Sequence, residues 1–278
     1  MLDLQCHQFI HSPYRLWETD LTSALVNYKW SQLGLSSDTY STTNAWHKKQ
    51  LIYTTGEPII SIKNQQVLLE EPDQIHLLPF YQANRLEIMD VNEVNLIDAQ
   101  QQLYAALSML NTVGTCGECV ALLVKAIQVL KPPAPEYDVS YSHPDIPFSI
   151  FVSVDTEQTQ STTLRLAESI LHEAMHLKLS LIEEYLPVIL PGSRATFHSP
   201  WRNEQRPIRG VLHGVFVFRA ILDFYKDLMS RLKEPMLIDF VDYRIEIIHQ
   251  EFATIEKLPS ATGFTAAGRQ LGLKLLQY

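Results

Sequence analysis

Apolar positions recur every three to four residues over several long stretches of the chain, and this spacing predicts amphipathic helices. Shorter runs rich in β-branched and aromatic residues, bounded by turn residues, predict strands instead. Helices are expected at residues 15–33, 98–111, 117–131, 164–186, 211–232, 239–258 and 265–276. Two strands are expected within 56–72, around a Lys63-Asn64 turn, and two more within 137–154, around a His-Pro-Asp turn. The stretch at 191–209 shows neither period and is expected to be a loop.

The proline-rich segment PPAPE at 132–136 is the best internal boundary. We therefore expect an N-terminal mixed α/β region at 1–132 and a catalytic region at 133–278. The first 95 residues are a candidate for peptide recognition through an exposed strand edge.

The stretch LHEAMHLKL at 171–179 lies in the middle of a predicted helix that follows a predicted strand. Residues four apart on a helix share one face, roughly 6 Å apart, so His172 and His176 can direct imidazole nitrogens at one ion. Glu173 is rotated by about 100° and can line the same site. The flanking residues are apolar, so the helix must be buried, and buried imidazoles must coordinate or hydrogen-bond. A metal site is favoured over core histidines that are merely satisfied by hydrogen bonds.

A metal held by two histidines usually has a third protein ligand. The metzincin class of metalloproteases is excluded. Its pattern requires glycine and histidine at two positions where this chain has Leu179 and Ile182. Glu183 and Glu184 lie on the same helix about 10 Å beyond His176, which is too far along the axis to share the ion.

Three histidines further along the chain are left as candidates for the third ligand, namely His198, His213 and His249. His213 is favoured, because it lies in the first turn of a strongly apolar predicted helix. Gly214 beside it would let another group approach closely.

Three arginines precede His213, with Trp201 among them: Arg202, Arg206 and Arg209. A guanidinium near a metal is suited to gripping a carboxylate with two parallel hydrogen bonds. A peptidase can use such a group for a substrate end, and an oxygenase can use it for the distal carboxylate of a 2-oxoacid. A solvated basic loop is the alternative for each arginine.

Composition narrows the class of protein. The 278 residues are 46% hydrophobic, which is typical of a globular protein with a well-filled core. The formal net charge of −9 and the lack of any basic run argue against nucleic acid as a partner. The longest apolar runs are too short for a membrane span, and the first residues do not resemble a secretory signal.

Three cysteines argue against a disulfide framework and favour a reducing cytoplasm. Two of them form CGEC at 116–119, between helical stretches and without a second such pair. We expect buried cysteines at a helix start rather than a redox pair or a zinc site.

The order of three motifs, LHEAMHLKL, SPWR and RPIRGVLHGVFVF, resembles the 2-oxoglutarate-dependent HExxH-type peptide β-hydroxylases of ribosomal peptide natural-product pathways. The likeness is concentrated at 145–225, with a weaker echo at 265–276. It implies an Fe(II) and 2-oxoglutarate oxygenase that β-hydroxylates a residue of a precursor peptide. Carried over by position, the resemblance implies His172, His176 and His213 as iron ligands and Arg202 or Arg206 as the oxoglutarate partner, with Arg209 still open. Glu173 is then expected to orient a ligand or bound water from behind. The alternative, which helix geometry disfavours, is that Glu173 binds the iron and His213 lies behind it.

The predicted fold is α+β and helix-rich, with a zincin-like core in which a small sheet precedes the buried HExxH helix. The first alternative function is a zinc metallopeptidase with Glu173 as general base. The second is a peptide-binding protein that has lost its metal.

Overall fold

The computed structural model describes residues 2–13, 15–34, 40–47, 56–89, 96–134, 137–155 and 157–277. These residues form ten α-helices, one 3-10 turn and seven short strands, so the predicted α+β, helix-rich class is confirmed. The helices are α1 (Leu2–His11), α2 (Thr19–Leu33), α3 (Thr42–Trp46), α4 (Leu78–Ala83), α5 (Leu96–Asn111), α6 (Cys116–Leu123), α7 (Gln160–Glu183), α8 (Ile208–Met229), α9 (Pro235–Thr254) and α10 (Ala266–Leu276), with η1 (Leu258–Ser260) as the 3-10 turn.

A mixed sheet of five strands has the order β1-β2-β3-β5-β4. Its central strands run parallel, whereas β1 and β4 are antiparallel to their neighbours. The strands are β1 (Gly56–Ile62), β2 (Gln65–Glu70), β3 (Ala126–Leu130), β4 (Ser140–Ser142) and β5 (Ser149–Ser153). Every residue of β3 and β5 is buried, as expected for parallel strands that are covered on both faces.

The sheet crosses the boundary that the sequence marks at 132–133. Strand β3 precedes the boundary and β5 follows it, yet the two strands pair over five residue positions. The buried apolar side chains of both regions also belong to one cluster. The two regions therefore share a sheet and a core.

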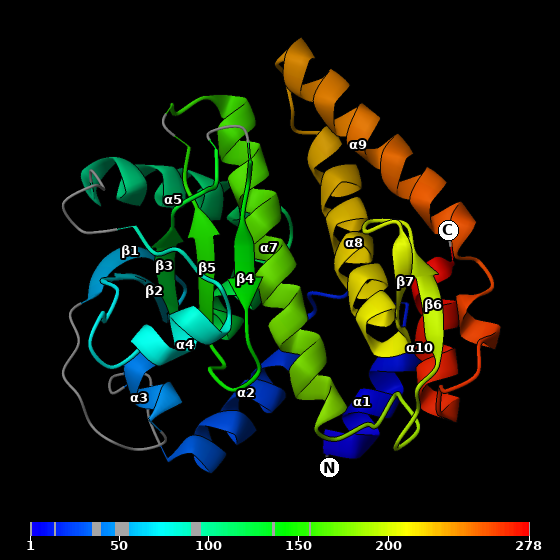
Figure 1. The fold of residues 1–278 in the computed structure, drawn as a ribbon. Helices are drawn as coiled ribbons and strands as arrows, with labels where there is room; N and C mark the ends of the chain where they lie inside the picture. The colour runs from blue at the N-terminus through cyan, green and yellow to red at the C-terminus, as the bar shows by residue number, and fades with distance from the viewer. Residues whose placement is uncertain are drawn as a thin grey trace.

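Helices cover the sheet and then extend away from it (Figure 1). Helix α7 contacts β4, β5 and α5, and α8 packs along α7 on the side away from the strands. Helix α4 lies on the viewer's side of the sheet in Figure 1, where its Phe80 ring approaches that of Phe151. Helices α9 and α10 pack against α8 in turn. This arrangement places the middle of α7 between β4 and α8.

Helix α7 begins at a capping box. The Thr159 hydroxyl accepts from the Thr162 amide, and the Thr162 hydroxyl accepts from the Thr159 amide. Ser161, Thr162 and Thr163 follow within four residues and could also cap a helix. The structure uses Thr159, so the helix begins a few residues before the apolar spacing that predicts it.

One predicted helix and one predicted loop are wrong. Residues 117–131 form α6 and then β3, because the apolar run AIQVL is buried on all sides between β2 and β5, and burial of this kind suits a short strand as well as a helix. The expected loop at 191–209 contains the hairpin of β6 (Thr196–Ser199) and β7 (Glu204–Pro207). Its short, mostly polar strands lack the apolar alternation by which strands are recognised.

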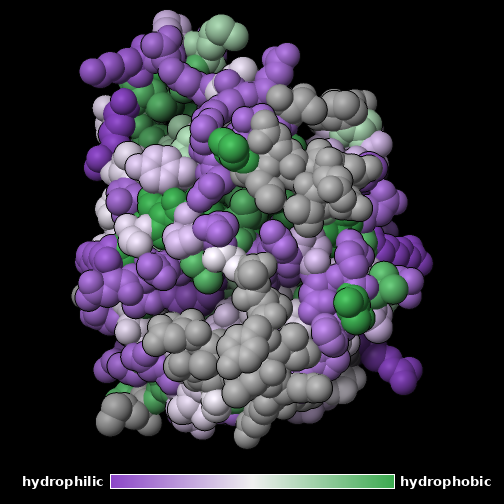
Figure 2. All heavy atoms as spheres, turned by 90° about the vertical axis from the view of Figure 1, so that its left-hand side faces the viewer, coloured by the Kyte–Doolittle hydropathy of each residue, from purple (hydrophilic) through white to green (hydrophobic). Residues whose placement is uncertain are grey.

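None of the helices in the described ranges is long and apolar enough to cross a bilayer. Figure 2 views the molecule from the β1 side and shows mostly hydrophilic side chains among the described residues, with apolar ones in separate groups.

The start of α10 is docked closely on the segment that follows α7. The Thr265 amide donates to the Val188 carbonyl, and a β-carbon at Gly268 would overlap that same carbonyl oxygen. We expect Gly268→Ala to destabilise the protein by about 1–3 kcal/mol, the usual cost of overpacking. Urea unfolding measures this change.

Gly210→Ala is the matched control, because its nearest neighbouring atom would lie 3.7 Å from the new β-carbon. This second substitution is expected to be neutral or to stabilise α8 by up to about 1 kcal/mol. Equal unfolding midpoints for the two variants would contradict the packing described for α10.

Candidate functional site

The HExxH stretch lies in the middle of α7, where its two histidines face each other one turn apart. The two Nε2 atoms of His172 and His176 are 3.1 Å apart, and the rings meet at 70°. Two nitrogens that each lie about 2.1 Å from one ion are separated by about 3.0–3.4 Å. The pair is therefore spaced as two ligands of a single metal would be.

Partial burial keeps both imidazoles uncharged, although the His172 side chain is still 26% exposed. Desolvation, with help from the charge of Arg202 and against that of Glu168, lowers the pKa of His172 to about 4. Desolvation also lowers the pKa of His176 to about 3, with help from His172, His213 and Arg206. A neutral imidazole is the form that binds a metal, so both groups are ready ligands near neutral pH.

Glu173 is held by the edge strand of the sheet. The Ser140 hydroxyl donates to its Oε1 atom and the Ser142 hydroxyl donates to its Oε2 atom, both at 2.6 Å. The two serines are two residues apart on β4 and so point to the same face. The carboxylate is only 4% exposed, and its Oε1 atom lies 4.0 Å from Nε2 of His172. Glu173 therefore stands behind the histidine pair with both oxygens already engaged.

His213 comes from the first turns of α8 and lies nearly parallel to His176, with the ring centroids 5.4 Å apart and an interplanar angle of 21°. Its Nδ1 atom lies 3.2 Å from Nδ1 of His176, which is the ring nitrogen that faces away from His172. Its Nε2 atom lies 3.1 Å from Oε2 of Glu183. The structure thus brings His213 next to the pair without directing it at the same point. Among the described residues, no three His, Cys, Asp or Glu side chains converge as a ligand set for one ion.

The two other histidines considered from the sequence lie elsewhere. His198 is exposed on β6 and His249 is on α9, and neither lines the cavity beside the motif. Of the three histidines, His213 is the one that lies beside the pair on α7.

A cavity of about 490 Å³, here called the central cavity, opens beside the motif. Its walls come from β4, the middle of α7, the β6–β7 hairpin and the start of α8. The sequence alone does not show that the residues predicted for the site meet in one place. All of them line this cavity: His172, Glu173, His176, Arg202, Arg206, Arg209 and His213.

The three arginines of the central cavity differ in what holds them. Arg209 grips Glu183 through Nε at 2.9 Å and through a terminal nitrogen at 2.5 Å. Arg206 has a single loose ion pair, with 3.9 Å between its Nε atom and Glu204. The Arg202 guanidinium makes no hydrogen bond or ion pair within the described part of the chain. Arg202 and Arg206 are thus available to a ligand, whereas Arg209 is already engaged.

Glu183 is a site residue that the sequence led us to set aside. Burial alone would raise the pKa of this carboxyl, but hydrogen bonds from His213 and Arg209 and the positive charge of Arg209 hold the pKa below its ordinary value. The spacing does indicate that Glu183 faces the site, because it follows His176 by seven residues and therefore lies on the same face of α7. The sequence does not show that His213 on α8 is its partner.

Two aromatic side chains, Trp201 and Phe218, form part of the wall of the central cavity. The rings of Trp201 and Phe218 stack at 4.9 Å, and the Trp201 indole donates to Glu251. A β-carbon at Gly214 would lie 2.6 Å from the Trp201 ring. Gly214 therefore does permit a close approach, as its position suggested, and the group that approaches is the indole.

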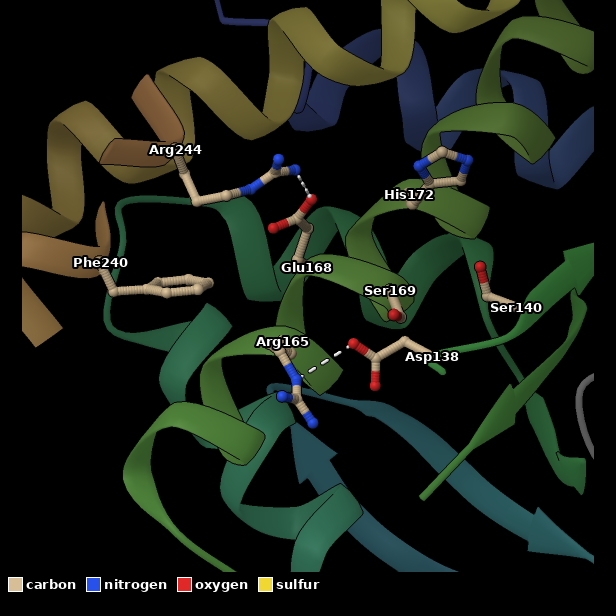
Figure 3. A pocket seen from close by; sticks show the side chains of 8 residues that line it. All are labelled: Asp138, Ser140, Arg165, Glu168, Ser169, His172, Phe240 and Arg244. Carbon is tan, nitrogen blue, oxygen red and sulfur yellow. Dashed lines mark hydrogen bonds and ion pairs between the residues drawn. The ribbon is translucent and has the colours of Figure 1, made fainter. Parts of the chain in front are cut away.

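A second, smaller pocket of about 290 Å³ shares His172 and Ser140 with the central cavity (Figure 3). We call it the side pocket. Its other lining residues come from the first turns of α7, from the segment before β4 and from α9. Figure 3 shows its four charged side chains as two ion pairs, Arg165 with Asp138 and Arg244 with Glu168. The two pockets together line α7 on both sides of His172.

The CGEC cysteines are confirmed as buried residues at a helix start. Cys116 and Cys119 are unpaired, inaccessible and located in the first turn of α6. Burial raises the pKa of both thiols, which disfavours the reactive thiolate form.

No protein-family model matches the chain, and a comparison with curated proteins gives no match either. Function is therefore inferred from the sequence motifs and from the geometry of the central cavity.

The buried imidazoles make the metal-free protein sensitive to acid. A histidine whose pKa is lower in the folded chain than in the unfolded chain binds its proton preferentially after unfolding. We expect full stability above about pH 6.5, the ordinary pKa of histidine, and a progressive loss as the pH falls toward 4. Urea unfolding of the metal-free protein across this range measures the loss.

His176→Gln should flatten the pH dependence, because the substituted side chain does not titrate. His11→Gln is the control, since His11 lies exposed at the end of α1. Unchanged acid sensitivity in the His176 variant would show that the imidazole is not the group responsible.

Proposed function

We propose that the chain is an Fe(II) and 2-oxoglutarate-dependent oxygenase that hydroxylates a peptide. The observation that carries the proposal is the composition of the central cavity, in which a pair of neutral imidazoles spaced for one metal faces two arginines that are free to bind an anion. The sequence resemblance to HExxH-type peptide β-hydroxylases points the same way.

The donor set fits iron. His172 and His176 would hold the ion through their Nε2 atoms, and Glu173 would stay behind them as a hydrogen-bond acceptor for the serines of β4. When bound, iron with 2-oxoglutarate and O₂ supplies the insertion of one oxygen atom into a C–H bond, while the oxoacid is converted to succinate and CO₂. Two histidine ligands leave several positions for such a cosubstrate.

The arginines favour an oxygenase over a peptidase. 2-Oxoglutarate is a dianion, and its distal carboxylate needs a cationic partner at some distance from the metal. Arg202 and Arg206 lie close enough to the imidazoles for their charges to lower the pKa values of His172 and His176. A guanidinium that is free of strong ion pairs does not have to give up a partner when the anion binds.

The position of Glu173 also weighs against the zinc peptidase alternative. A general base must reach the proton of a metal-bound water with a free carboxylate oxygen. Here both oxygens accept hydrogen bonds from serines, which stabilise the charged form and make the carboxylate a weaker base. The arrangement suits a group that braces the HExxH turn.

A peptide is the substrate class that the surroundings of His172 favour. Strand β4 is an edge of the sheet as described, and an extended peptide can add to a free strand edge. The central cavity and the side pocket flank this edge and meet at Ser140 and His172. An elongated ligand along β4 would thus place successive side chains in the two pockets. We infer a zincin-like core on the same grounds, with the sheet edge lying over the motif helix.

The proposal is tested by binding under anaerobic conditions. Fe(II)-loaded protein should bind 2-oxoglutarate in isothermal titration calorimetry, and Arg202→Gln or Arg206→Gln should weaken that binding by about 10–100-fold, the value of one or two charge-assisted hydrogen bonds. Arg231→Gln, a substitution of an exposed arginine after α8, should leave it unchanged. Failure of the iron-loaded protein to bind 2-oxoglutarate would contradict the oxygenase.

Glu173→Gln separates the oxygenase from the zinc peptidase. Glutamine keeps the shape of the side chain and can still hydrogen-bond Ser140 and Ser142, whose hydroxyls can rotate to suit it. The oxygenase should therefore keep metal binding and at least about a tenth of its 2-oxoglutarate turnover, because Glu173 transfers no proton in the hydroxylation. A zinc-dependent peptide cleavage that this substitution abolishes would instead establish the peptidase.

A further inference from the structure

We propose that Glu183 is a positioning residue that fixes the protonated nitrogen of His213 and, through His213, that of His176. In this arrangement His213 supports His176 from behind rather than binding the same ion. The inference builds on the metal site of the proposed function, but its first test is read in the metal-free protein.

The geometry forms a continuous chain of short contacts. Oε2 of Glu183 lies 3.1 Å from Nε2 of His213, and Nδ1 of His213 lies 3.2 Å from Nδ1 of His176. Nε2 of His176 then lies 3.1 Å from Nε2 of His172. The chain alternates between α7 and α8, so it forms only when these two helices are packed together.

The positions of the protons follow from which groups can donate. An ionised carboxylate only accepts hydrogen bonds, so the hydrogen at the Glu183 end must be on Nε2 of His213. A neutral imidazole carries one N–H, which leaves Nδ1 of His213 as an acceptor. Its neighbour, Nδ1 of His176, must then be the donor. Nε2 of His176 is consequently bare, and this is the atom that faces His172.

The bare nitrogen is the one that the metal requires. Histidine ligands commonly donate their second N–H to a neighbouring acceptor, which fixes the ring and the ligating nitrogen. Here that acceptor is an imidazole that is itself oriented by Glu183. Without the carboxylate, either nitrogen of His213 can carry the hydrogen, and His176 loses the preference for its ligating form.

Arg209 completes the arrangement at the outer end. Its Nε and terminal nitrogens donate to the Glu183 carboxylate, whose Oε2 atom also faces Nε2 of His213. The Glu183 side chain is only 12% exposed, whereas that of Arg209 is 52% exposed. The role of Arg209 is thus to hold Glu183 in place, and the cosubstrate carboxylate is left to Arg202 and Arg206.

The neighbouring residue provides a matched control. Glu184 is the next glutamate on the chain and forms its own ion pair with Lys29 at 2.5 Å. Glu184→Gln therefore removes the charge of a glutamate that is adjacent to Glu183 in the chain but does not contact His213.

The first experiment is ¹⁵N NMR of histidine-labelled, metal-free protein at neutral pH. We expect wild-type His213 to be protonated at Nε2 alone and His176 at Nδ1 alone. Glu183→Gln should convert His213 to a mixture of forms, because a carboxamide can donate as well as accept. Glu184→Gln should leave both spectra unchanged. A doubly protonated His213, or a His213 that is insensitive to Glu183→Gln, would overturn the proposal.

The second experiment adds Zn(II) as a spectroscopically silent probe of the same site. Zinc should shift the Nε2 resonances of His172 and His176 and leave Nδ1 of His213 without the shift of a ligating nitrogen. Glu183→Gln should weaken zinc binding by about 10–100-fold, as is usual for groups behind a metal ligand, while Glu184→Gln changes it less than about twofold.

The outcomes separate the two proposals. A ligating shift at Nδ1 of His213, or unaltered zinc affinity in Glu183→Gln with an unchanged melting temperature, would refute the positioning role. Zinc binding without any binding of 2-oxoglutarate by the iron form would remove the oxygenase and leave the role of Glu183 intact. Glu183→Asp is the second variant if Glu183→Gln does not fold, and it should restore the wild-type form of His213 in part.

Discussion

The partial burial of two imidazoles in the middle of α7 is the constraint on which the rest of the site depends. Desolvation holds His172 and His176 uncharged, and their Nε2 atoms are then free for a cation. The same burial obliges every polar neighbour to find a partner. Strand β4 therefore supplies serines to Glu173, and α8 supplies His213 to His176. The packing of α7 between the sheet and α8 is what makes these contacts possible.

The central cavity combines two kinds of group with different tasks. The imidazoles of His172 and His176 and the carboxylate of Glu173 all come from the middle of α7, and two serines of β4 hold the carboxylate. The arginines come from the hairpin of β6 and β7 and from the start of α8, closer to solvent. A fixed metal pair beside a more exposed set of cations is an arrangement that can accept an anionic cosubstrate from solution. Arg209 differs from the other two because Glu183 occupies it.

The sequence predicted the elements that have a clear period and missed those that do not. The motif helix and the first hairpin were found, since their apolar spacing is regular. The run that forms β3 is fully buried and has no period to distinguish a strand from a helix, and the strands of the β6–β7 hairpin are too polar to show apolar alternation. The sequence indicates candidate site residues by their chemistry, but it does not show which of them are in contact. Glu183 lies too far along α7 to share an ion with His176, and only the packing of α8 brings His213 to it.

X-ray absorption spectroscopy of the protein loaded with one equivalent of Fe(II) tests the central claim most directly. The account predicts scattering from two imidazole rings at iron–nitrogen distances of about 2.1 Å, and a change in the iron coordination when 2-oxoglutarate is added without oxygen. Iron surrounded only by oxygen atoms, or coordination that does not respond to the oxoacid, would contradict it.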